Sequence, residues 1–172
     1  KTGIRERHIV AENETALDLG FESAEKVLQT YDRKKIDFLL LCTQSPDYYL
    51  PTSACILQDK LGLRSDIGAF DYNLGCSGFI YGLAMAKSFI KTGISDSVLL
   101  ITSETYTKHI HPKDKSNRTI FGDGAAATII EKSDEEGIFE AINFEQGSAI
   151  SENPFGDGKA AEKIISIINE EI

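Results

Sequence analysis

Cys76 is the residue of this chain best placed to do chemistry. It lies in the segment NLGCSG at 73–78, between a strand-like run at 67–72 and a helical pattern that begins at Phe79. The N–H groups and the positive dipole end of a helix N-terminus stabilise a thiolate, which is the nucleophilic form of cysteine. Its small neighbours leave room for a substrate carbonyl to approach the sulfur. The alternative is a buried structural cysteine, since free cysteines are among the most buried residues.

The other two cysteines have no obvious chemical partner. Cys42 lies inside a continuous apolar run at 36–43 and is expected in the core, and Cys55 falls on a short helix. An odd number of cysteines without metal-like spacing predicts neither a disulfide framework nor a zinc site. No metal is therefore expected in this protein.

A cluster of positive side chains lies between residues 108 and 118 of an otherwise acidic chain. With 18 Lys and Arg against 27 Asp and Glu, the net charge of −9 argues against nucleic acid as the partner. The cluster is either a solvated loop or a surface that recognises phosphate. Its two histidines have no suitably spaced carboxylate or cysteine, so they do not predict a metal site. The members are Lys108, His109, His111, Lys113, Lys115 and Arg118.

Strand-like and helix-like segments alternate along the chain, which predicts an α/β layered architecture. Thr15 and Asp18 form a capping-box pattern at the start of the first helix. The periodicity predicts helices at 15–31, 51–62 and 79–92, strands at 36–43, 67–72, 98–102 and 125–130, and a long loop at 103–117.

The helix after Cys76 is apolar on most sides and is therefore predicted to be central. Gly78 and Gly82 are unusual inside a helix, and they indicate close packing against another backbone. The chain has 41% hydrophobic and 26% charged residues, as in ordinary globular proteins. Neither an apolar run of membrane length nor a signal-peptide pattern is visible, which predicts a cytoplasmic protein without a membrane partner.

Six short motifs lie in order along the chain, at 2–7, 18–22, 43–52, 73–78, 103–106 and 120–125. Taken in this order, they resemble β-ketoacyl-acyl-carrier-protein synthase III, a condensing enzyme of the thiolase superfamily. The resemblance implies a thiolase-like layered fold, one half of an αβαβα core, with a mixed sheet and a buried central nucleophile helix. It implies a nucleophile-bearing half at 1–132 that lacks the family's first strand, and it leaves 133–172 unplaced, with an amphipathic helix within 153–172.

The same resemblance implies roles for particular residues. Cys76 accepts an acyl group from coenzyme A, and the thioester condenses with malonyl on acyl carrier protein, with loss of carbon dioxide and without a cofactor. Lys1 and Lys115 match basic positions that contact the coenzyme A nucleotide. Leu50 matches the position that reaches across a homodimer into the partner's acyl pocket, and the strand at 67–72 pairs the two subunits.

The catalytic histidine and asparagine of the family are expected in a C-terminal half that this chain does not contain. None of His8, His109 or His111 lies in a matching motif. Two alternatives stay open. One is another acyltransferase or ketosynthase of the superfamily, from secondary metabolism or of the hydroxymethylglutaryl type. The other is a noncatalytic dimerisation or carrier-binding module.

Overall fold

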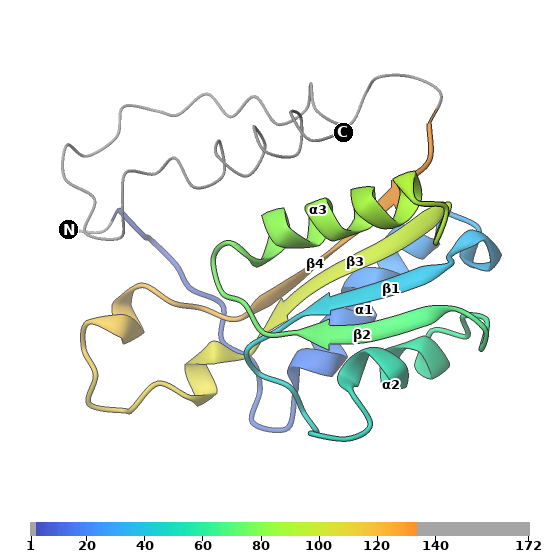
Figure 1. The fold of residues 1–172 in the computed structure, drawn as a ribbon. Helices are drawn as coiled ribbons and strands as arrows, with labels where there is room; N and C mark the ends of the chain where they lie inside the picture. Colours follow the sequence, from blue (N-terminus) through green and yellow to red (C-terminus); the bar gives the residue numbers. More distant parts are fainter. Residues whose placement is uncertain (1–2, 134–172) are drawn as a thin grey trace, which may run out of the picture. The chain divides into compact units, whose positions relative to one another are not determined.

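A computed structural model describes residues 3–133 (Figure 1). The helices and strands predicted in this range are present, with ends shifted by a few residues. The predicted loop at 103–117 starts later than expected, because Ser103 and Glu104 still pair with β4 as the end of β3. The elements are α1 Ala16–Leu28, β1 Phe38–Cys42, α2 Ser53–Lys60, β2 Gly68–Tyr72, α3 Gly78–Lys91, β3 Ser97–Glu104 and β4 Gly124–Glu131, with short 3₁₀ turns η1 Arg33–Lys35, η2 Tyr106–Lys108 and η3 Asn117–Thr119.

The four described strands form one mixed sheet in the order β2-β1-β3-β4. β1 pairs in parallel with β2 and β3, and β4 pairs antiparallel to β3. The continuous apolar runs of β1 and β3 fit their central places, since inner strands with both faces covered are apolar throughout. β2 and β4 form the two edges of the described sheet.

Helices cover both faces of the sheet, with α1 and α2 on one side and α3 on the other (Figure 1). Successive strand residues point to opposite faces, so Leu99 and Ile101 pack towards α1 and α2 while Leu100 packs towards α3. This arrangement is a three-layer αβα unit, as the α/β prediction required.

The helix starts are fixed by side chains. The predicted capping box is present, because the Thr15 hydroxyl accepts the Asp18 N–H while the Asp18 carboxylate accepts the Thr15 N–H. At α2 the N-cap residue makes no side-chain capping bond. Instead Asp71 of β2 accepts the N–H groups of Ser53 and Ala54 at 2.8 and 2.6 Å. The sheet therefore sets the start of α2, a contact that the sequence did not reveal.

Gly78 and Gly82 let α3 approach the sheet closely, as predicted, but the partners are side chains and not another backbone. A Cβ on Gly78 would lie 2.2 Å from the Cys42 sulfur, and one on Gly82 would lie 2.4 Å from the Tyr72 hydroxyl and 2.6 Å from Leu100. The prediction of a backbone partner was wrong because sequence spacing shows where bulk is missing, not what fills the space.

The buried residues of α3 are small: Gly78, Gly82 and Ala86. The outward residues Phe79 and Tyr81 are 39% and 44% exposed. Within residues 3–133 the sheet thus covers one side of α3, and its apolar outer side is open.

The chain divides into two units, Lys1–Glu131 and Lys132–Ile172. The second unit lies almost entirely outside the described residues. The predicted segment at 133–172, with its amphipathic helix, therefore stays a prediction. In the described range, no helix combines the length and the apolar character of a membrane span.

Candidate active site

The parallel strands β1, β2 and β3 all finish at the same end of the sheet, the carboxyl end (Figure 1). The connections that follow these strands, at 43–52, 73–77 and 105–123, all begin at this end. Open α/β sheets bind their ligands outside the carboxyl ends of parallel strands. A site is therefore expected at this end of the sheet, and Cys76 lies in the second connection.

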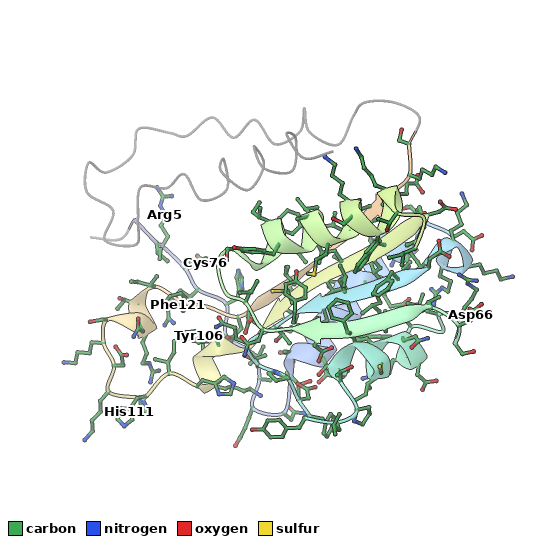
Figure 2. All side chains as sticks on the ribbon, viewed as in Figure 1. Arg5, Asp66, Cys76, Tyr106, His111 and Phe121 are labelled. Carbon is green, nitrogen blue, oxygen red and sulfur yellow. The ribbon has the colours of Figure 1, made fainter. Side chains whose placement is uncertain are left out.

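Cys76 is exposed in the turn that leads into α3 (Figure 2). The Gly78 N–H closes the turn by donating to the Gly75 carbonyl at 2.8 Å, and Ser77 occupies the N-cap without a side-chain capping bond. The first N–H groups of α3 are thus not capped by Ser77. The predicted place of Cys76 before a helix N-terminus is confirmed, and its catalytic role stays a prediction.

The other cysteines differ from Cys76 in environment. Cys42 is buried, as predicted, and burial raises the pKa of its thiol, which disfavours the thiolate. Cys55 is exposed but lies within α2, where it accepts a hydrogen bond from the Thr52 hydroxyl at 3.4 Å. Exposure alone does not separate Cys55 from Cys76, whereas the place of Cys76 ahead of a 14-residue helix does.

Glu104, at the end of β3, binds the first of the three connections. Its carboxylate accepts the Gln44 N–H and the Ser45 hydroxyl, the latter at 2.8 Å. The Gln44 side-chain oxygen in turn lies 3.0 Å from the point where a Cβ on Gly75 would be. Burial raises the pKa of Glu104, although its hydrogen bonds partly offset the rise. Glu104 therefore holds the first connection beside the Cys76 turn, a role that no sequence motif indicated.

Asp123 holds the third connection together. Its carboxylate accepts the N–H groups of Thr107 at 2.9 Å and Val10 at 3.0 Å, and the Asp123 N–H donates to the His8 carbonyl at 2.8 Å. Next to it the rings of Tyr106 and Phe121 meet edge to face at 5.2 Å (Figure 2). The segment at 8–10 and the ends of the 105–123 connection thus form one fixed unit.

The positive cluster is partly used for structure. The Lys108 ammonium donates to the carbonyls of Glu12 and Glu14, and Arg118 donates to the Pro112 carbonyl at 3.1 Å. Lys115 is exposed, and its predicted contact with coenzyme A stays a prediction. Lys1, its predicted partner in that contact, lies outside the described residues.

No metal site is formed by the residues that the structure describes, where no group of three or more His, Cys, Asp or Glu side chains is suitably placed. His111 lies on the loop away from Cys76 (Figure 2), and its Nδ1 accepts the Lys113 N–H at 3.2 Å.

Leu50 is 84% exposed in the connection between β1 and α2. Tyr48 and Tyr49 beside it are 58% and 97% exposed. This apolar loop is open in the described chain, so the predicted role of Leu50 in a partner's acyl pocket stays a prediction.

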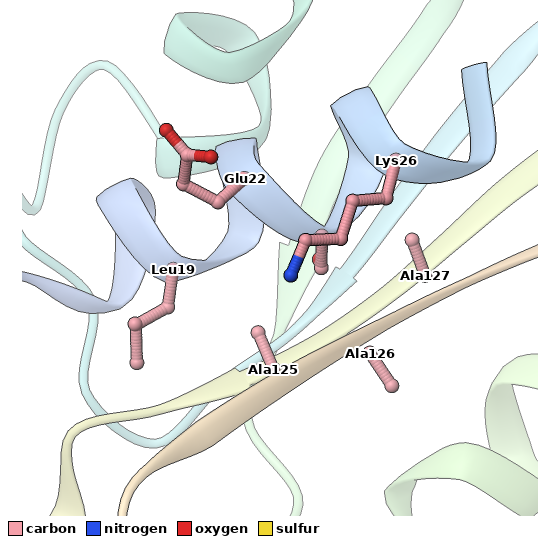
Figure 3. Close-up of a pocket in the computed structure, with 7 residues that line it drawn as sticks. Leu19, Glu22, Lys26, Ala125, Ala126 and Ala127 are labelled. Atoms are coloured by element: carbon pink, nitrogen blue, oxygen red, sulfur yellow. The ribbon is translucent and has the colours of Figure 1, made fainter. Parts of the chain in front are cut away.

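A hollow of about 360 Å³ lies between α1 and β4 (Figure 3). It is on the α1 side of the sheet, whereas the Cys76 turn leads into α3 on the opposite side (Figure 1). We do not place the chemistry there. Its lining residues are Leu19, Glu22, Ser23, Lys26, Ala125, Ala126 and Ala127.

Comparisons with known proteins find similar sequences and similar folds. A family model described as 3-oxoacyl-[acyl-carrier-protein (ACP)] synthase III matches residues 70–149. The chain is 38% identical over 183 aligned residues to a β-ketoacyl-[acyl-carrier-protein] synthase III of Vibrio vulnificus (strain YJ016). This alignment covers 100% of this chain and 56% of the relative. The similarity thus extends past residue 132, further than the sequence motifs predicted.

Solved structures share the fold. A crystal structure of a 3-oxoacyl-(acyl-carrier-protein) synthase III is 54% identical with a TM-score of 0.77, over 79% of this chain and 41% of that one. The priming β-ketosynthase of the R1128 polyketide pathway is 31% identical with a TM-score of 0.74, over 78% and 41%. The predicted thiolase-like layered fold is confirmed. The chain spans about half the length of the curated relatives it matches.

Proposed function

Since this chain belongs with the β-ketoacyl-acyl-carrier-protein synthases III in both sequence and fold, we propose that it is the nucleophile-bearing part of such an acyltransferase. The reaction is the condensation of an acyl-coenzyme A primer with malonyl-acyl carrier protein, which starts fatty-acid synthesis. Cytoplasmic location is part of the same proposal.

In the proposed reaction the Cys76 thiolate attacks the carbonyl carbon of the acyl-coenzyme A. The new carbon–sulfur bond forms as the bond to the coenzyme A sulfur breaks, and coenzyme A leaves as a thiol after taking a proton. Decarboxylation of malonyl on the carrier protein then leaves a carbanion that attacks the acyl-cysteine, which forms a carbon–carbon bond and returns the Cys76 thiolate. The intermediate divides one difficult transfer into two easier steps, and we propose that no cofactor takes part.

One observation supports this role above the others. Cys76 is exposed immediately ahead of a long helix, inside the segment that the family model matches. Neither buried Cys42 nor Cys55 within α2 has this combination.

Lys1 and Lys115 are proposed to contact the coenzyme A nucleotide. Lys115 is exposed on the connection after β3, whose start lies at the same end of the sheet as Cys76. A lysine binds phosphate as a point charge, without the two-pronged contact of arginine. Lys115→Ala is therefore expected to raise the acyl-coenzyme A concentration needed for half-maximal acylation of Cys76 more than it lowers the maximal rate.

We further propose a homodimer paired through β2. β2 is an edge of the described sheet and its residues are only partly buried. An unpaired strand edge is a template for pairing with another chain. Leu50→Ala then widens the acyl pocket of the partner and changes the preferred chain length more than stability. A monodisperse monomer in light scattering at micromolar concentration contradicts the dimer, and unchanged chain-length preference contradicts the role of Leu50.

The acyl-enzyme is tested by intact-mass measurement after incubation with acetyl-coenzyme A. We expect a mass increase of one acetyl group in the full chain, its loss in Cys76→Ala and its retention in the matched control Cys55→Ala. Because His8, His109 and His111 match no catalytic motif, the chain alone is expected to make no ketoacyl product. An adduct on another cysteine, or none at all, would refute the proposed site.

A second candidate is a priming ketosynthase of secondary metabolism. The likeness to the priming β-ketosynthase of the R1128 pathway favours it. The two candidates share Cys76 and the acyl step, and they differ in the primer. Comparing acylation rates for acetyl-coenzyme A and for longer acyl-coenzyme A substrates distinguishes them.

A further inference from the structure

Two carbonyl groups flank Cys76, and each accepts a hydrogen bond from a side chain of the sheet. The Cys42 thiol donates to the Leu74 carbonyl at 3.2 Å, and the Tyr72 hydroxyl donates to the Gly78 carbonyl at 2.8 Å. Leu74 stands two residues before Cys76 and Gly78 two residues after it. The turn is thus tied to the sheet on both sides of its cysteine.

The two donors are neighbours. Cys42 ends β1, Tyr72 ends β2, and the two residues are direct partners in the parallel ladder. Partners in a ladder point to the same face, and here that is the face under α3, where Tyr72 packs against the core. The side chains therefore form one polar pair beneath the Cys76 turn.

Both members of the pair are held in the protonated form that can donate. Burial raises the pKa of Cys42, and burial together with the adjacent Cys42 raises the pKa of Tyr72. A neutral thiol is a donor and a poor nucleophile. Cys42 is thus suited to supporting the turn and unsuited to replacing Cys76.

The glycines of α3 are shaped around this pair. A Cβ on Gly78 would lie 2.2 Å from the Cys42 sulfur, and a Cβ on Gly82 would lie 2.4 Å from the Tyr72 hydroxyl. Neither separation is possible between real atoms, so α3 reaches its place only because both residues lack a side chain. The pair therefore fixes the distance between the start of α3 and the sheet, as well as the direction of the two carbonyls.

We propose that Tyr72 and Cys42 are positioning residues for Cys76, a role that rests on the proposed function of Cys76 as the acyl acceptor. In a planar trans peptide the C=O and N–H groups point in opposite directions. Holding the Leu74 carbonyl towards Cys42 therefore turns the Gly75 N–H away from it, and holding the Gly78 carbonyl fixes the first residue of α3 against the sheet. Without the pair the turn between these two points adopts other orientations, and the place of Cys76 within it is no longer fixed.

The test uses the full chain and the alkylation rate of Cys76 by iodoacetamide at neutral pH, read by peptide mapping against Cys55 in the same sample. Tyr72→Phe and Cys42→Ala each remove one donor, and we expect Cys76 to react about fivefold more slowly, the size of one net hydrogen bond, while Cys55 is unchanged. Cys42→Ser keeps a donor and is expected to retain the wild-type rate. Tyr81→Phe, on the exposed side of α3, is the matched control.

The serine variant separates positioning from mere packing. If Cys42→Ser is as slow as Cys42→Ala, or if Cys76 reacts at the wild-type rate in both Tyr72→Phe and Cys42→Ala, the inference is overturned. Circular dichroism of each variant confirms folding, and the two donors provide independent variants if one of them unfolds. If acetyl-coenzyme A leaves no adduct while the donor variants still slow alkylation, the positioning role stands and the proposed function fails. If an acetyl adduct forms on Cys76 at the same rate in both donor variants as in wild type, the proposed function stands and the positioning role fails.

Discussion

The two faces of the sheet are built in different ways. The face under α1 and α2 is covered by large apolar side chains from two helices, including Leu17, Leu28 and Leu57, which are almost fully buried. The face under α3 has a smaller core, to which α3 contributes the buried Ala86 and four larger side chains that are only partly buried, Leu83, Met85, Phe89 and Ile90. The first face gains its stability from bulk, and the second brings a helix close to the sheet.

This difference in packing bears on the Cys76 turn. Large side chains hold two layers about 10 Å apart, whereas glycines let backbones and polar groups meet. The Cys76 turn is on the second face, where Tyr72 and Cys42 reach its carbonyls. Phe79 and Tyr81, on the outer side of α3, lie outside this core.

The largest expected effect compares two neighbours in β3. Leu99 packs towards α1 and α2 and Leu100 towards α3, and both are fully buried. Leu99→Ala leaves a cavity inside the larger core and is expected to cost about 4 kcal/mol, whereas α3 can settle into the space left by Leu100→Ala, which is expected to cost about 2–3 kcal/mol. Urea unfolding followed by circular dichroism measures both. Equal costs, or a larger cost for Leu100→Ala, would show that the faces are packed alike.

A second comparison uses one glycine from each face. In α3, a Cβ on Gly82 would meet Tyr72 and Leu100 at 2.4 and 2.6 Å, so Gly82→Ala is expected to destabilise by about 1–3 kcal/mol. In α1, a Cβ on Gly20 would lie 3.5 Å from Ile101 and Leu57, which is ordinary contact, so Gly20→Ala is expected to stabilise by up to about 1 kcal/mol.

Thermal unfolding of the two glycine variants gives shifts of opposite sign if this is correct. Gly82→Ala combined with Leu100→Ala is the control, because the second change removes one of the two colliding groups. The double variant is expected to be more stable than the sum of the two single effects. A stabilising Gly82→Ala would mean that α3 is not held against the sheet by this contact.

The sequence predicted the elements well where periodicity and caps report them directly. The Thr15 and Asp18 capping box, the apolar runs of β1 and β3, and the turn from β2 through Cys76 into α3 were all visible as local patterns. These features depend on residues close together in the chain. Local spacing is enough to fix them.

The contacts that organise the site were not predictable in the same way. Asp71 caps α2, Glu104 holds the connection after β1, and Tyr72 reaches the Gly78 carbonyl, yet no motif identifies any of these partners. Asp71 and Glu104 each join separate elements through a half-buried side chain. Periodicity shows which face a residue occupies, and only the fold shows what stands opposite.

The third comparison concerns two carboxylates, Asp71 at the start of α2 and Glu104 beside the Cys76 turn. Burial raises the pKa of both. The folded state therefore binds protons more tightly than the unfolded chain, whose values are about 3.9 and 4.3. Their contribution to stability is fully present below those values and is lost as pH rises through the raised folded pKa.

In urea titrations, the stability of wild type minus that of Asp71→Asn, or of Glu104→Gln, should fall from pH 4 upward. A difference that is flat or rises with pH contradicts the sign.

The smallest expected effect is on the outer side of α3, at Tyr81. Its ring is nearly half exposed, so Tyr81→Ser should change the stability of the isolated chain by no more than about 0.5 kcal/mol, far less than the change at Leu100 beneath the same helix. The measurement is urea unfolding at two protein concentrations. A cost above about 1 kcal/mol that grows with concentration would mean that another copy of the chain covers this side. The outer side of α3 would then be buried against a second copy of the chain, and the small core on this face would be a property of the monomer alone.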